Sequence, residues 1–121
     1  MTAERIELRS VREATEAIDR LGSNNSRLMA TRAIHINVLV RQVPGPEARV
    51  LKTLYNDVGA EAAISSQAYT AEQGAVTDMI VMGTVYQHRE VRRVLAEDLK
   101  TRPWIDAIES VVENTPETRE P

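Results

Sequence analysis

The feature that most constrains the fold is the hydrophobic period, which switches from that of a strand to that of a helix and back, twice along the chain. Across residues 33–41, apolar residues alternate with other residues, which is the period of a half-buried β-strand. Across residues 51–58 they recur at i, i+3, i+4 and i+7, the spacing of one helix face. Residues 76–86 are again dense in β-branched and apolar side chains, and residues 89–100 return to the helical period. The chain is therefore predicted to alternate between strands and helices.

A weaker strand at 60–70, a turn at 71–74 and a final strand at 104–113 complete the predicted order of strand, helix, strand, strand, helix, strand. This order is that of an α+β, ferredoxin-like βαββαβ sandwich, with helices at 46–58 and 88–101 on one face of a four-stranded antiparallel sheet. Residues 4–21 are predicted to form an amphipathic helix. The predicted divisions are 1–32 for this helix and a polar linker, 33–113 for the domain and 114–121 for a disordered tail.

Two stretches of this domain carry a family resemblance: "INVLVRQVPGPEARVLKTLYNDVGAEAAISS" and "TDMIVMGTVYQHREVRRVLAEDLKTRPWIDAIESV". With the "P-W-I-x-x-I" run near their end, they resemble the ACT domain, a small regulatory module. The resemblance implies a non-catalytic, small-molecule-sensing or regulatory domain. Gln42 and Val43 stand where amino-acid-binding members of that family often carry an acidic residue.

A second resemblance is to the ACT-like soluble C-terminal domain of MgtC/SapB-type membrane proteins, which ends in a similar proline-bearing run after a polar linker. It implies a cytoplasmic regulatory domain of a membrane protein, in which the helix at 4–21 would be a juxtamembrane remnant or an unrelated addition. This alternative stays open beside the first.

The proline-glycine corner between the first strand and the first helix is the predicted ligand site. Its backbone N–H groups at Gly45, Glu47 and Ala48, together with the helix dipole, suit a small anionic or amino-acid-like ligand. Two serines of the second strand are predicted to complete the site across a dimer edge. The full set of candidate ligand-binding residues is Val43, Pro44, Gly45, Pro46, Glu47, Ser65 and Ser66. The alternative is that the corner only turns the chain.

The first strand also places His35, Asn37 and Arg41 on the sheet face away from the helices. One interpretation is a solvated or dimer-covered surface. The other is a polar pocket of a small dimeric α+β barrel enzyme, similar to a monooxygenase, with His35 as a base. His88, which opens the second predicted helix, is expected in solvent. Because a sheet with helices on one side leaves the other side bare, a homodimer is the expected partner arrangement.

Composition excludes several classes of function. A net charge of −3 and a pI near 5.4 argue against general nucleic-acid binding. With no cysteine and two histidines, the chain is predicted to hold no metal, and no cofactor motif is present. No catalytic residues are assigned, because no nucleophile or phosphate-binding motif occurs. No apolar run reaches the length of a membrane span, so a cytoplasmic protein without direct membrane insertion is predicted.

Overall fold

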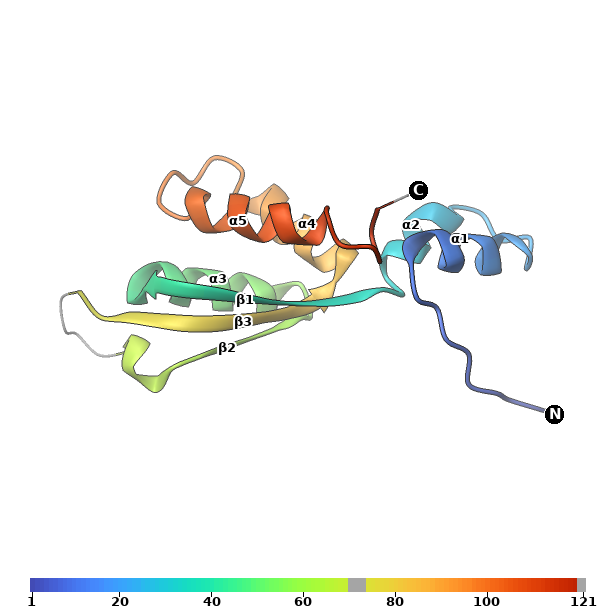
Figure 1. The fold of residues 1–121 in the computed structure, drawn as a ribbon, viewed down its shortest axis with the longest axis horizontal. Coiled ribbons are helices and arrows are strands. Elements are labelled where there is room, and N and C mark those ends of the chain that lie inside the picture. The colour runs from blue at the N-terminus through green and yellow to red at the C-terminus, as the bar shows by residue number, and fades with distance from the viewer. Residues whose placement is uncertain (70–73, 120–121) are drawn as a thin grey trace.

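The computed structural model describes residues 1–69 and 74–119, in which three strands form one sheet and helices pack on one of its faces (Figure 1). Two helices lie at one end of the molecule, and the remaining elements form its body. In chain order the elements are α1 (Val11–Asp19), α2 (Ser26–Thr31), β1 (His35–Pro44), α3 (Gly45–Asp57), β2 (Glu61–Ile64), the 3-10 helix η1 (Ser66–Tyr69), β3 (Val76–Thr84), α4 (Val85–Val94) and α5 (Arg102–Val112).

The sheet has the strand order β1-β3-β2, and β3 runs antiparallel to both neighbours. Val81 at the centre of β3 faces Val38 on one side and Ala62 on the other. The β1–β3 register shifts between Val40 and Val43, where Gln42 has a positive φ of 56°. This shift is a β-bulge, and it lies next to the corner that leads into α3.

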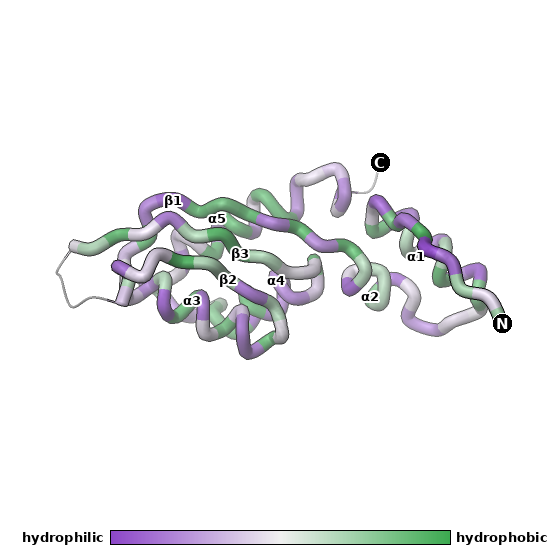
Figure 2. Tube along the Cα trace, turned by 90° about the horizontal axis from the view of Figure 1, so that it is seen from below, coloured by the Kyte–Doolittle hydropathy of each residue, from purple (hydrophilic) through white to green (hydrophobic). Residues whose placement is uncertain are grey.

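The core lies between the sheet and helices α3, α4 and α5. Residues of β1 before the bulge alternate between exposed and buried, so they alternate between the two faces of the sheet. In Figure 2 the tube of β1 carries both hydrophobic and hydrophilic segments. We call the helix-packed side the covered face and the other the open face. The covered face is formed by Ile36, Val38 and Val40 of β1 and Met79 and Val81 of β3, all buried. The predicted placement of the even-numbered β1 residues under the helices is therefore confirmed.

The predicted fourth strand is wrong, because residues 102–112 form helix α5. Three apolar residues of this segment, Ile105, Ile108 and Val112, recur at i, i+3 and i+7 and are all buried. This spacing places them on one helix face, and Pro103 lies in the first turn, where its missing N–H is tolerated. The sheet of the described residues is thus three-stranded, and the four-stranded ferredoxin-like sandwich is not formed.

The N-terminal region also differs from the prediction. The helix expected over 4–21 begins at Val11, where the Ser10 hydroxyl accepts from the Glu13 N–H at 3.0 Å. Residues before it form an arm that leaves the body (Figure 1). Helix α2 begins within the predicted polar linker, at Ser26. Both helices contribute to the same buried cluster as the sheet, through Val11, Ala14 and Ala30.

After α5, residues 114–119 turn back against the start of α1. The Glu117 C=O accepts from the Val11 N–H at 2.8 Å, and Thr118 is buried. These residues were expected to belong to a disordered tail. Residues 120–121 of that tail, and residues 71–73 of the predicted turn, lie outside the described residues.

Candidate functional site

The proline-glycine corner is the junction between β1 and α3, as the sequence predicts. The Gly45 N–H, however, donates to the Ala75 C=O at 3.0 Å and is not available to a ligand. A Cβ atom on Gly45 would lie 3.0 Å from the Ala68 carbonyl oxygen, a contact too close for any other residue without a shift. The glycine is therefore required by the close approach of η1 to the corner.

Few other groups at the corner face solvent. Val43 and Ala48 are fully buried, and Pro46 has no N–H to donate. Glu47 is half-buried in the first turn of α3. The interpretation of the corner as a turn of the chain gains support from this packing, while ligand binding there stays a prediction.

The two serines of the predicted site lie at the end of β2 and the start of η1, and η1 packs on α3 of the same chain. Their placement across a dimer edge stays a prediction. The Ser65 N–H donates to the Thr77 hydroxyl at 3.0 Å, and the Ser65 hydroxyl accepts from the Gln67 N–H at 3.2 Å. Ser66 is exposed and begins η1, whose Ala68 carbonyl accepts from Arg49 of α3. The described contacts of Ser65 thus serve the local turn.

The polar side chains of β1 lie on the open face, as predicted. His35 Nε2 is 2.9 Å from the Asn37 Oδ1 atom, and Arg41 is 3.7 Å from the Asp78 carboxylate. Arg41 thus lies towards the bulge and Asp78, while His35 contacts Asn37. These side chains form two separate pairs, and the three residues of the enzyme interpretation do not meet at one point.

An apolar row crosses the open face between these polar pairs. Leu39 of β1 faces Ile80 of β3, which faces Ala63 of β2. Leu39 is 50% exposed and Ile80 is 42% exposed. Exposed apolar side chains that are contiguous across strands are typical of a surface that contacts another molecule.

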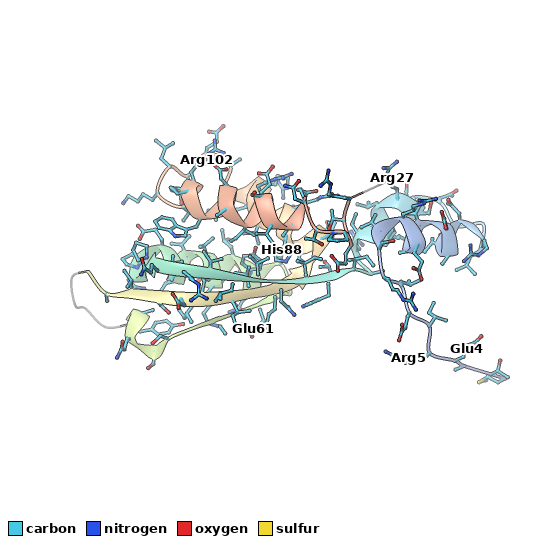
Figure 3. All side chains as sticks on the ribbon, in the orientation of Figure 1. Glu4, Arg5, Arg27, Glu61, His88 and Arg102 are labelled. Atoms are coloured by element: carbon cyan, nitrogen blue, oxygen red, sulfur yellow. The ribbon has the colours of Figure 1, made fainter. Side chains whose placement is uncertain are left out.

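The prediction that His88 lies in solvent is wrong. It is 4% exposed, on the inner side of α4 facing the sheet (Figure 3). Its Nε2 atom lies 2.8 Å from the Ile36 carbonyl oxygen, and its Nδ1 atom lies 2.8 Å from the Tyr55 hydroxyl. A carbonyl only accepts, so Nε2–H donates to Ile36 and Nδ1 accepts the Tyr55 proton. The neutral imidazole is fully hydrogen-bonded in this arrangement.

Burial controls the protonation of this pair. It lowers the pKa of His88 and raises the pKa of Tyr55, so both side chains stay neutral near pH 7. A cavity of about 10 Å³ lies beside them, which is close to the room that one water molecule needs. A cavity of this size holds no organic substrate, and the pair is interpreted as a structural element of the core.

The outer edge of β1 is the largest unpaired backbone feature of the described residues. Within 1–69 and 74–119, β1 pairs with β3 alone, and no strand lies along its other edge. The Val85 N–H donates to the Ile34 C=O, so the backbone groups of Ile34 are directed towards the β3 side. Because every second residue of a strand directs its N–H and C=O to the same side, the even-numbered residues before the bulge also direct theirs towards β3. The odd-numbered residues from His35 to Arg41 therefore direct theirs outward.

Helix α5 presents a second apolar stripe beside this edge. Trp104, Ala107 and Val111 recur at i, i+3 and i+7, on a different face from the buried stripe. Trp104 is half-buried, Ala107 is exposed and Val111 is 46% exposed. They line a groove whose other wall is formed by β1 residues 38–41. We call this edge and its groove the β1–α5 edge.

The described residues contain neither a metal-ligating cluster nor a membrane-spanning helix. No group of three or more histidine, cysteine, aspartate or glutamate side chains in that part of the chain is placed to hold a metal ion. None of the helices described there combines the length and apolarity needed to cross a membrane.

Comparison of the chain with protein-family models, with curated proteins and with solved structures found no match. The ACT-like and MgtC/SapB-like resemblances therefore stay predictions.

Proposed function

We propose that the protein is a non-catalytic interaction domain that forms a homodimer through its β1–α5 edge. The observation that carries the proposal is the juxtaposition of the unpaired outer edge of a ten-residue strand with an exposed apolar helix stripe. A long unpaired edge is a template for pairing with another strand, and natural proteins commonly cover or interrupt such edges. The predicted ACT-like character supports the same proposal, because it implies a regulatory domain.

The edge can pair with itself about a two-fold axis. Antiparallel pairing of β1 with a second copy about an axis at Leu39 would use the outward backbone groups of Asn37, Leu39 and Arg41 on both strands. An axis near Leu39 would bring the two Leu39 side chains together and extend the apolar row of the open face into the second copy. The two three-stranded sheets would then form one six-stranded sheet.

The same axis would bring the two α5 helices together on the covered side. Their stripes of Trp104, Ala107 and Val111 would face each other, and the small Ala107 near the middle allows a close helix approach. A specific interface buries about 1,200–2,000 Å² in total, with aromatic anchors near its centre. Strand pairing and helix packing would both contribute to this area, and Trp104 would supply the anchor.

The test is a charge placed within the α5 stripe. We expect Ala107→Glu to convert the dimer into a 13.5 kDa monomer in light scattering after size-exclusion chromatography, because two buried carboxylates would face each other across the axis. Ser110→Glu is the matched control, since Ser110 is exposed on the same helix but outside the stripe. The control is expected to remain a dimer of twice that mass.

A second variant tests the strand edge itself. The Leu39 N–H points outward, so Leu39→Pro removes a donor from the dimer ladder and none from the β1–β3 ladder. We expect a monomer that keeps its circular-dichroism spectrum. A wild-type protein that is monomeric at a concentration of about 100 µM would contradict the proposal. An Ala107→Glu variant that stays dimeric would contradict it as well.

A further inference from the structure

A trough of arginine side chains runs along the outer side of α4, away from the β1–α5 edge. It consists of two adjoining cavities that share Leu28, Thr31 and Arg89 in their walls. The larger has a volume of about 550 Å³ and lies between α2, α4 and α5. The smaller, of about 310 Å³, lies between α2 and the turn after α5. Both volumes fall in or near the range of small-molecule sites.

The walls of this arginine trough are cationic although the whole chain carries a net charge of −3. Five arginines line the two cavities, against two glutamates. Figure 3 shows Arg27 and Arg102 towards opposite ends of this helical side of the molecule. The arginines are Arg27, Arg89, Arg92, Arg93 and Arg102, and the glutamates are Glu90 and Glu109.

Ion pairs hold the guanidinium groups of α4 in place without using all of their donors. Arg89 donates through Nε and Nη2 to the Glu113 carboxylate, both at 2.8 Å. Arg92 contacts Glu109 at 2.8 Å through Nη1, and Arg93 contacts Glu90 at 2.7 Å through Nε. A guanidinium has five N–H donors, so each retains donors for a ligand. Oriented guanidinium groups suit phosphate, which they bind in a fork geometry.

Two groups of the trough lack a partner among the described residues. The guanidinium group of Arg102, at one end, makes no ion pair or hydrogen bond with that part of the chain. At the other end, Thr118 is 8% exposed, and its buried hydroxyl has no hydrogen-bond partner among the described residues. A buried hydroxyl without a partner is costly. Because this oxygen has almost no accessible surface, a ligand atom would satisfy it once the Thr118 side chain turns towards the smaller cavity, which Thr118 lines.

We propose that the arginine trough binds an elongated, phosphate-bearing small molecule with several anionic groups. One anionic end lies against Arg92, Arg93 and Arg102, and the other lies against Arg89 and the Thr118 hydroxyl. Tyr86 stands in the wall of the larger cavity, where its ring, with one face covered by the Arg32 guanidinium at 4.2 Å from the ring centre, lies beside the body of the ligand. Because the trough does not include the β1–α5 edge, its occupancy does not depend on dimerisation.

The test uses inorganic phosphate, pyrophosphate and tripolyphosphate as probes of increasing length, at an ionic strength matched with sodium chloride. We expect calorimetric affinity for the full-length protein to rise with probe length, because only a longer anion reaches more of the trough. Arg102→Gln should weaken tripolyphosphate binding by about tenfold, since a hydrogen bond between charged groups contributes roughly that factor or more. The expected effect on inorganic phosphate is smaller.

Two further variants separate a site from general charge attraction. Arg20→Gln removes the same charge from an exposed position at the end of α1, outside the trough, and should leave every affinity unchanged. Thr118→Val should weaken tripolyphosphate binding without lowering the melting temperature of the unliganded protein, because it removes an unpaired buried hydroxyl. The proposal is overturned if tripolyphosphate does not bind the wild type, or if Arg20→Gln weakens binding as much as Arg102→Gln does.

Discussion

The two faces of the sheet differ in what covers them. On the covered face, Met79 and Val81 of β3 are buried under the helices. On the open face, their neighbour Ile80 is 42% exposed and lies in a row with Leu39 and Ala63. The same strand thus presents a packed interior on one side and an uncovered apolar surface on the other.

We expect the two faces to have different roles, the covered face in the stability of the single chain and the open face in contacts with a second copy. The covered face holds the core cluster and the buried His88–Tyr55 pair, so its residues are expected to determine the free energy of unfolding. The open face and the adjoining β1–α5 edge are expected to contribute little to the free energy of unfolding of a single chain. Their apolar residues are expected to stabilise the dimer instead. Four predictions test this comparison, from the largest expected effect to the smallest.

Two adjacent residues of β3 provide the strongest test. Met79→Ala removes a large side chain that is 1% exposed, and it should lower the free energy of unfolding by about 2–5 kcal/mol. Ile80→Ala, one residue later on the open face, should cost under about 1 kcal/mol in a single chain. Urea denaturation of both variants measures the difference. Equal losses would show that the two faces do not differ in the way described.

The Tyr55–His88 hydrogen bond should give the next largest effect. Tyr55→Phe removes the donor to His88 Nδ1 and leaves a buried acceptor unsatisfied, so we expect a loss of about 1–3 kcal/mol. Tyr86→Phe is the control, because its hydroxyl donates to Glu90 at the surface at 3.1 Å. That control should change the free energy of unfolding by less than about 1 kcal/mol.

A pH dependence should follow from the buried histidine. Because burial lowers the pKa of His88 in the native state, the unfolded chain binds more protons at pH values below its histidine pKa of about 6.5. The free energy of unfolding should therefore be full above about pH 6.5 and fall as the pH drops towards the lower native pKa. Urea titrations from about pH 5 to 8 should show a shallower slope for His88→Gln. An unchanged slope in that variant would assign the effect to another group.

The smallest expected effect lies at the bulge on the β1 edge. Gln42 has a positive φ of 56°, which is unfavourable for a residue with a Cβ atom. Gln42→Gly should relieve this conformation while losing some unfolded-state entropy, for a net stabilisation of up to about 1 kcal/mol. Its N–H would still donate to the Asp78 carboxylate, as it does now at 2.9 Å. Thermal denaturation would detect the change, and a clear decrease in melting temperature would contradict it.

Local pattern was sufficient for several elements. The alternation of Ile36, Val38 and Val40 predicted β1 and its covered face, and the spacing of Leu51, Leu54 and Tyr55 predicted α3. Strand β3 and the start of its following helix were also predicted within a few residues. In each of these segments one periodicity dominates, and the local preference agrees with the tertiary packing.

The candidate sites were predicted less well, because their properties depend on distant residues. The corner was identified correctly as a strand-to-helix junction, but its Gly45 amide is used by Ala75, thirty residues later in the chain. The arginine trough was not predicted at all, since its walls come from α2, α4, α5 and the turn after α5. The clustering of Arg89, Arg92 and Arg93 on one helix was the only local signal.

The sequence by itself determined where the strand and helix periods change, the apolar stripe of α3 and the positions of the main turns. Only the tertiary structure decided that residues 102–112 form a helix, because Ile105, Ile108, Val111 and Val112 in so short a segment suit both a strand and a helix. It also decided the place of His88, whose polar neighbours in the sequence suggest solvent. The two groups that satisfy its ring, Tyr55 and the Ile36 carbonyl, lie 33 and 52 residues away and reach it only when α3, α4 and β1 pack together.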